Sequence, residues 1–154
     1  MEKTSCYTYF SITSNGIIDI RGLQATDKGI FDPANITKML GVLPFSSWKK
    51  GDKRKTGYPY YGFSAWSGAK STLDTLVIEE QVLETISLLK EKIEVLLQIK
   101  SLYDVSFAIV IVPEIINEET PAIHFNKETI DFCYKTGTEI DIDMYIYQFG
   151  DKDE

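Results

Sequence analysis

The chain has 154 residues, of which 44% are hydrophobic and 25% charged, and its formal net charge is −7. This length predicts one globular domain, residues 1–150, with a disordered tail at 151–154. No apolar run is long enough to cross a membrane and the N-terminus has no apolar signal core, so we expect a cytoplasmic protein. The acidity argues against nucleic-acid binding, which needs a broad basic surface, and suits a protein that binds basic partners.

The first third of the chain predicts strands followed by a short helix. Residues 6–13 are rich in Tyr, Phe, Ile and Thr, which is typical of a strand. A turn signal follows, and residues 17–21 fit a short second strand. Within 31–44, Asp32 is a good N-cap, Pro33 suits the first helical position and Gly41 ends the helix.

The middle of the chain predicts a loop, a strand and one long helix. Residues 46–59 are charged and punctuated by Gly and Pro, as loops are, and 60–67 read as a strand. Residues 79–101 predict the longest helix. Its apolar stripe comprises Val82, Ile86, Leu89, Ile93 and Leu96.

The last third predicts a central strand, a helix and a final strand. Residues 105–112 are almost wholly apolar and fit a buried strand that Pro113 ends. A short strand is expected at 122–125, and Asn126 caps a helix that runs to about 135. Residues 139–147 alternate polar and apolar side chains. We expect the apolar ones in the core: Ile140, Ile142, Met144 and Ile146.

These elements predict an α+β fold. We expect a mixed, mostly antiparallel sheet of about five or six strands with three helices mainly on one face. A doubly wound parallel sheet is the alternative, disfavoured by the polar faces of the first and last strands. Phe31 and Phe125 each precede a short helix with matched apolar spacing, which suggests a duplicated strand–helix–strand unit.

Three carboxylates in the final strand are the first candidate site. Glu139, Asp141 and Asp143 are spaced to share one face of a strand. They would bind a basic partner, hold a divalent metal for a small enzyme, or form a plain solvated face. No cofactor is expected.

A basic and aromatic segment at 46–66 is the second candidate. It has five of the sixteen Lys and Arg residues, both tryptophans and a net charge of +4, which leaves −11 for the rest of the chain. Such a segment suits protein recognition, single-stranded nucleic acid or a small ligand, or is a mobile loop with its tryptophans in the core. The candidate residues here are Trp48, Lys49, Lys50, Asp52, Lys53 and Arg54.

Catalytic motifs are missing from the sequence. It has no GxSxG, HExxH or phosphate-binding Gly-rich pattern, and its one histidine, His124, lies between apolar residues. We therefore predict that the protein is not an enzyme.

Several fragments in fixed order resemble a known family. They are FDPANITKMLGVLP at 31–44, WKKGD at 48–52, SAWS at 64–67 and GTEIDIDMY at 137–145. Together they resemble an uncharacterised bacterial family of small cytoplasmic domains with no established activity. Its members look similar to immunity proteins encoded beside bacterial toxins. The family's usual Pro-Gly-Ile is replaced here by Pro121, Ala122 and Ile123.

Two hypotheses follow. The first is a non-enzymatic immunity or antitoxin-type inhibitor, a monomer or homodimer, that binds a cognate toxin through the acidic strand or the 46–66 segment. The second is a small metal-dependent enzyme or ligand-binding domain that uses Glu139, Asp141 and Asp143. A third, plainer possibility is a structural subunit or homodimer built on the exposed edge of the last strand.

Overall fold

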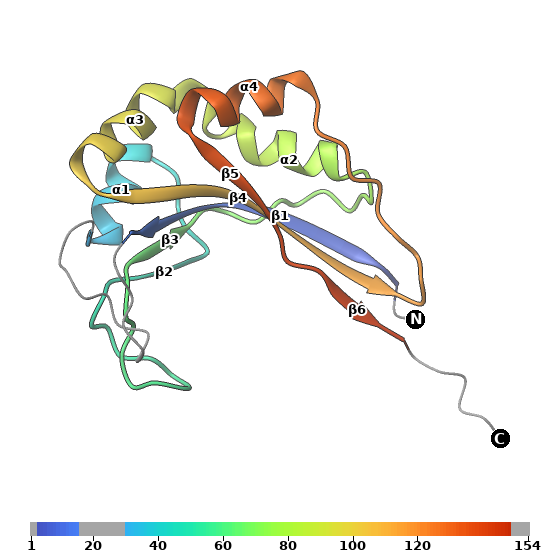
Figure 1. The fold of residues 1–154 in the computed structure, drawn as a ribbon, viewed down its shortest axis with the longest axis horizontal. Coiled ribbons are helices and arrows are strands. Elements are labelled where there is room, and N and C mark those ends of the chain that lie inside the picture. Colours follow the sequence, from blue (N-terminus) through green and yellow to red (C-terminus); the bar gives the residue numbers. More distant parts are fainter. Residues whose placement is uncertain (1–2, 16–29, 149–154) are drawn as a thin grey trace.

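The computed structural model describes residues 3–15 and 30–148, which form a single sheet with helices on one side (Figure 1). In chain order the elements are β1 (Ser5–Ser14), α1 (Pro33–Leu40), β2 (Ser46–Trp48), β3 (Ala65–Ser67), α2 (Ile78–Ser87), the 3₁₀ turn η1 (Lys90–Lys92), α3 (Ile93–Leu102), β4 (Val105–Ile116), α4 (Lys127–Thr136), β5 (Thr138–Ile142) and β6 (Tyr145–Tyr147). The strand expected at 17–21 and the tail at 151–154 lie outside the described residues.

The sheet is mixed and mostly antiparallel, which confirms the predicted α+β class. Its strand order is β2-β3-β1-β4-β5, with β6 also beside β4. β1 is antiparallel to both β3 and β4, and β2 is antiparallel to β3. Only β5 and β6 run parallel to β4. Figure 1 shows the helices on the same side of the sheet, and the described residues form four α-helices instead of the expected three.

β4 is longer than predicted because Pro113 does not end it. The strand continues to Ile116, and Cys6 of β1 pairs with Pro113. Ile111 directs its carbonyl toward the β5 side, where it accepts a hydrogen bond from Asp143 N at 2.8 Å. Pro113, two residues on, therefore has its missing N–H on that side too. The hydrogen bond that Pro113 cannot donate is therefore missing on the β5–β6 side, and the pairing of β4 with β1 stays intact.

β5 and β6 are one edge strand with an interruption opposite Pro113. Ile111 pairs with Ile142 and Glu114 pairs with Tyr145, so the same register against β4 continues across the break. The prediction of a buried apolar row along this strand is wrong beyond Ile140. Ile142, Met144 and Ile146 are 46%, 45% and 65% exposed. In Figure 1, β6 lies at the end of the sheet farthest from α1 and α3, so helices do not cover these side chains.

The predicted long helix is divided into α2 and α3. The 3₁₀ turn η1 separates them, although residues 78–102 contain neither Gly nor Pro. Val82 and Leu96 of the predicted stripe are both fully buried, one in each half. Both halves pack against β4 and α4, but α2 also packs against β1 and α3 against α1. A break lets both halves stay on a sheet that twists beneath them, and tertiary packing therefore overrides local helix preference.

α1 and α4 use the same capping devices but are not equivalent. Asp32 and Asn126 each accept a hydrogen bond from the first turn, and Gly41 and Gly137 end the helices with left-handed φ of 67° and 66°. The sheet positions differ, because β2 follows α1 at one edge and β5 follows α4 at the other. The duplicated unit is not confirmed. Its matched residues also differ in burial: Ile36 and Leu40 are fully buried, whereas Ile130 and Tyr134 are exposed.

The core lies between the sheet and the helices. Trp66 is fully buried there, and its Nε1 donates to Thr37 Oγ1 of α1 at 3.0 Å. The sheet contributes Phe10, Ile12, Phe107, Ile109 and Ile111 to the same cluster.

Two short elements differ from the predictions. The strand expected at 122–125 is reduced to a single bridge between Ala122 and Val77. The strand expected at 60–67 forms only over Ala65–Ser67, and its partner β2 lies in the segment expected to be a loop.

Candidate functional site

The sheet face opposite the helices is the candidate surface, here called the open face. Residues paired across neighbouring strands share a face, so the register of the strands defines which residues belong to the open face. Tyr9 pairs with Val110, which pairs with Asp141. Tyr7 pairs with Val112 in the next row. None of the described helices lies on this side of the sheet in Figure 1.

The three predicted carboxylates follow one another along the β5–β6 edge of the open face. Glu139 and Asp141 pair with Ala108 and Val110, and Asp143 continues the register through its hydrogen bond to Ile111 O. All three are exposed. We call Glu139, Asp141 and Asp143 the acidic strip. Within residues 3–15 and 30–148, no Lys or Arg forms an ion pair with them.

The acidic strip does not form a metal site among the described residues. The backbone rises roughly 6–7 Å between alternate residues of a strand, so the three carboxylates are spread over roughly 13 Å of strand and not gathered around one point. In the part of the chain that the structure describes, no group of three or more His, Cys, Asp or Glu side chains is arranged to hold a metal.

Tyrosines join the acidic strip on the open face. Burial raises the pKa of Tyr7, and the carboxylates of Glu114 and Asp143 raise it further. Burial also raises the pKa of Tyr9, and the charges of neighbouring groups, Asp143 and Asp141 among them, raise it further. These phenols therefore stay protonated and keep an O–H donor beside the carboxylates.

Tyr145 is bonded directly to the acidic strip. Its hydroxyl donates to Asp143 Oδ2 at 3.1 Å, and this hydrogen bond together with the charge of Asp143 raises its pKa. We call Tyr7, Tyr9, Glu114, Tyr145 and the acidic strip the acid–tyrosine surface.

A lysine already rests on the aromatic rings of this face. Lys70 Nζ lies 4.2 Å from the ring centroid of Tyr7 and 4.9 Å from that of Phe45. Phe45 in turn meets Tyr9 edge-to-face, with ring centroids 5.0 Å apart. The rings attract an ammonium group through their negative faces. The open face is thus chemically suited to cationic side chains.

The segment between β2 and β3 is largely the loop that we expected, but turns and one antiparallel bridge between Lys53 and Tyr60 organise it. Asp52 Oδ2 accepts from Lys49 N at 2.8 Å, and Tyr61 N donates to Asp52 O at 2.9 Å. Arg54 N donates to Pro59 O at 2.9 Å. The turns use positive φ at Gly51 and Gly57. The Asp52 side chain and these glycines explain the order despite the dense charge.

Trp48 is the centre of an aromatic stack in this segment. Its ring lies 4.3 Å from that of Tyr61 at an interplanar angle of 12°, and Phe63 meets it edge-on at 5.7 Å. The guanidinium carbon of Arg54 lies 5.1 Å from the centroid of the Tyr61 ring. Trp48 Nε1 is buried without a hydrogen-bond acceptor among the described residues. A hollow of about 390 Å³ beside the stack is lined by Ser47, Trp48, Asp52, Lys53, Arg54, Lys55, Thr56 and Tyr61.

The two predicted sites lie at opposite edges of the same face. Trp48 pairs with Ala65 and Ala65 with Thr13, so Trp48 belongs to the open face. The β2 edge and the β5 edge are four strand spacings apart, roughly 19 Å. Lys49 and Lys53 are exposed near the β2 edge, while Lys50 is half-buried and its N donates to Ser64 Oγ at 3.1 Å. The segment beside the β2 edge is therefore basic, and the β5 edge is acidic.

Sequence reasoning missed the tyrosines of the open face. The alternation along β1 could have revealed them. Phe10 and Ile12 lie in the core, so Tyr7 and Tyr9, at odd-numbered positions of the same strand, face the opposite side of the sheet. Glu114 was not recognised as part of this face, because the strand was expected to end at Pro113 and β4 in fact includes Glu114. His124 is exposed and has no place in either site.

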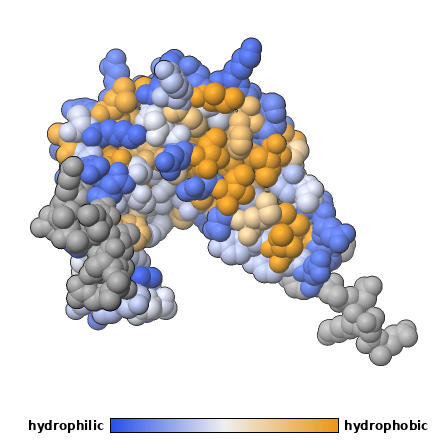
Figure 2. Space-filling model, viewed as in Figure 1, coloured by the Kyte–Doolittle hydropathy of each residue, from blue (hydrophilic) through white to orange (hydrophobic). Residues whose placement is uncertain are grey.

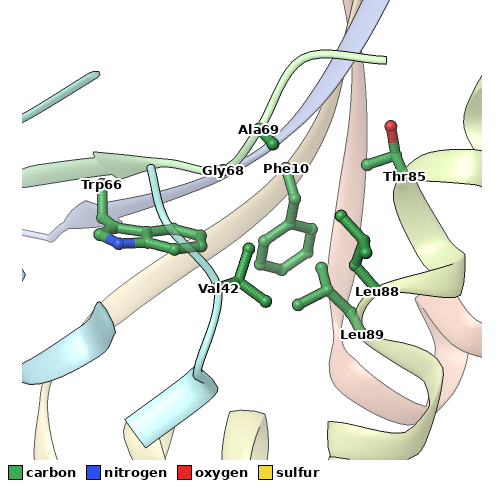
Figure 3. A pocket seen from close by; sticks show the side chains of 8 residues that line it. All are labelled: Phe10, Val42, Trp66, Gly68, Ala69, Thr85, Leu88 and Leu89. Atoms are coloured by element: carbon green, nitrogen blue, oxygen red, sulfur yellow. The ribbon is translucent and has the colours of Figure 1, made fainter. Parts of the chain in front are cut away.

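A second hollow lies on the helix side, between the β3 end, α2 and the segment after α1 (Figure 3). Its volume is about 10 Å³, which is about the space for one water molecule. Figure 3 shows Phe10, Val42, Trp66 and Leu89 directed into it, so it is a small packing defect and not a ligand site.

No helix in the described part of the chain is long and apolar enough to cross a membrane. Neither the curated proteins nor the solved structures contain a match to this sequence. A family model does match residues 4–147, nearly the whole chain. The resemblance drawn from the sequence fragments is thereby confirmed at the level of the family, whose description gives no activity. The chain belongs to the family described as a domain of unknown function (DUF4279).

Proposed function

We propose that this protein is a non-enzymatic, cytoplasmic binding module of the immunity or antitoxin type, and that its open face occludes a basic toxin. The observation that carries the proposal is the acid–tyrosine surface. Within the described residues no Lys or Arg forms an ion pair with its acidic strip, and the hydroxyl of Tyr145 donates to Asp143. Tyrosines are enriched at the energetic centres of protein interfaces, and complementary charge speeds association.

The size of the open face supports a protein partner. β1 is ten residues long, and the sheet is four strand spacings wide between β2 and β5. At most, the face measures roughly 34 Å by 19 Å, or about 650 Å², because β2 and β3 are three residues long and the full width holds only at one end. A standard stable interface buries about 800 Å² on each partner, so a protein partner would cover this face together with its edges.

The remaining nucleophile chemistry also favours binding over catalysis. Burial raises the pKa of the Cys6 thiol to about 11, which keeps it protonated and unreactive at neutral pH. His124 is exposed and forms no side-chain hydrogen bond to a nucleophile within the described residues. The metal-dependent alternative loses support from the wide spacing of the acidic strip, and no described observation favours it.

The test is capture of the partner with the intact chain as bait, followed by charge reversal of the acidic strip. We expect the pair Asp141→Lys and Asp143→Lys to weaken the affinity for the captured basic protein at least tenfold. The loss should shrink as salt screens the interaction. The matched control is Glu91→Lys with Glu94→Lys, which makes the same change in net charge at exposed positions on the helix side.

Two results would decide this test, and a third measurement gives the oligomeric state. Equal affinity of the strip variant and the control in calorimetry would contradict a role for the acidic strip. Failure to capture any basic protein would contradict the inhibitor proposal itself. The mass of the isolated chain in solution separates the monomer from the homodimer, which the proposal accommodates equally.

A further inference from the structure

The outer side of the β5–β6 edge is the best-defined unoccupied surface in the described structure. β5 ends the strand order, and both β5 and β6 pair only with β4 among the described strands. We infer that this edge binds an extended basic segment of the partner by strand addition. The inference rests on the proposed function and adds to it the partner's local structure and the mode of binding.

The hydrogen bonds toward β4 show which backbone groups face outward. Asp143 N donates to Ile111 O, and Tyr147 O accepts from Asn117 N, so the odd-numbered residues direct their amides toward β4. Successive residues of a strand direct their amides to opposite sides. Ile140, Ile142 and Ile146 therefore direct their N–H and C=O groups outward. An added strand would pair with these groups, as in other strand-addition complexes.

The side chains along the same edge give the added strand a chemical preference. The acidic strip faces one side of the sheet, and the exposed side chains of Ile142, Met144 and Ile146 face the other. Figure 2 shows apolar surface continuing from the middle of the molecule along the end that carries β6. A complementary segment alternates Lys or Arg with apolar residues. Its basic side chains would then meet the carboxylates and its apolar ones would cover the isoleucines.

A second copy of this chain fits the edge poorly. Two β5 strands related by a twofold axis would pair antiparallel, which places the two acidic strips side by side on one face. Like charges directly opposite each other destabilise a sheet. The acidic strip thus opposes self-pairing, a common protection of natural edge strands, while it attracts a basic strand.

The first test uses a short, capped peptide of alternating lysine and valine as the probe. Amide hydrogen exchange of the whole chain is followed by NMR with and without the peptide. We expect exchange of the Ile140 and Ile142 amides to slow at least tenfold, with Asp143 unchanged because it already bonds to β4. A peptide of alternating glutamate and valine should give no protection. If the lysine peptide leaves both outward amides unprotected, the inference is overturned.

The second test removes one outward donor. Ile142→Pro deletes an N–H that no neighbour in the described structure accepts, at an edge position where proline is tolerated. We expect it to weaken peptide binding at least tenfold, whereas Ile142→Ala, which keeps the N–H, should weaken it only a few-fold. Protection of the Asp143 amide in both variants confirms that β5 still pairs with β4. Equal binding by Ile142→Pro and Ile142→Ala would contradict strand addition.

The same variants separate this inference from the proposed function. If a captured partner discriminates against the Asp141→Lys and Asp143→Lys pair but binds Ile142→Pro normally, the inhibitor proposal stands and strand addition fails. If no partner is captured, the proposed function fails, and protection of the outward amides still decides how the edge binds an extended basic segment.

Discussion

Alternate residues of β1 meet two different environments. Phe10 and Ile12 face the helices and are buried in the core, whereas Tyr7 and Tyr9 face the open side beside carboxylates. The same strand therefore contributes to the core on one face and to the acid–tyrosine surface, for which we propose recognition, on the other. Substitutions on the helix-covered face should change the free energy of unfolding. Substitutions on the open face should change binding with little effect on stability.

The largest expected effect is at Trp66, and Trp48 is its counterpart on the open face. Trp66→Ala removes a fully buried indole and its hydrogen bond to Thr37, so we expect a loss of about 3–5 kcal/mol of unfolding free energy. Trp48 is only partly buried, and Trp48→Ala should cost on the order of 1–2 kcal/mol. Urea denaturation measures both. Equal losses would contradict the assignment of the two tryptophans to different faces.

A smaller effect compares two threonines of β1. Thr8 is buried, and its hydroxyl bonds Thr85 Oγ1 at 2.7 Å and Gln81 O at 3.1 Å, which ties β1 to α2. Thr8→Val leaves the buried Thr85 hydroxyl without this partner and should cost about 1–3 kcal/mol. Thr13→Val, on the open face of the same strand, should stay within about 0.5 kcal/mol. If Thr13→Val lowers the free energy of unfolding as much as Thr8→Val does, the two faces of β1 do not differ in their contribution to stability.

Much of the helix-covered face was predictable because local chemistry and tertiary structure agree there. Asp32 and Asn126 cap their helices and Gly41 and Gly137 end them as the sequence indicates. The helix division at η1 was not predictable, since no breaker residue marks it and the twist of the sheet decides it.

The open face was predicted only in parts. Alternation placed Glu139 and Asp141 on one side of a strand, and the register confirms this. Sequence spacing cannot reveal that Trp48 shares this face, because that relation depends on a strand order in which neighbours in space are distant in sequence. The exposure of Ile142 and Ile146 was also missed, because it depends on how far the helices extend over the sheet. Spacing along the strand gives no information on that.

The smallest effect tests the electrostatics of the acid–tyrosine surface. Asp143→Asn removes a negative charge that raises the pKa of Tyr145, Tyr9 and Tyr7, so all three phenols should ionise at lower pH than in the unchanged chain. Glu114→Gln is the control, because Glu114 raises the pKa of Tyr7 but is not among the causes for Tyr9 or Tyr145.

Site-resolved tyrosine NMR titration distinguishes these responses. A phenol whose pKa is raised in the folded state stabilises the fold below its ordinary pKa of 10, and that contribution is lost as pH rises through the folded value. Asp143→Asn should therefore reduce the decline of stability with alkaline pH, and Glu114→Gln should reduce it less. If Tyr9 and Tyr145 respond to Glu114→Gln as strongly as to Asp143→Asn, the carboxylates act through the general charge of the protein. If they respond only to Asp143→Asn, the acidic strip and the tyrosines form one local unit, as a specific binding face requires.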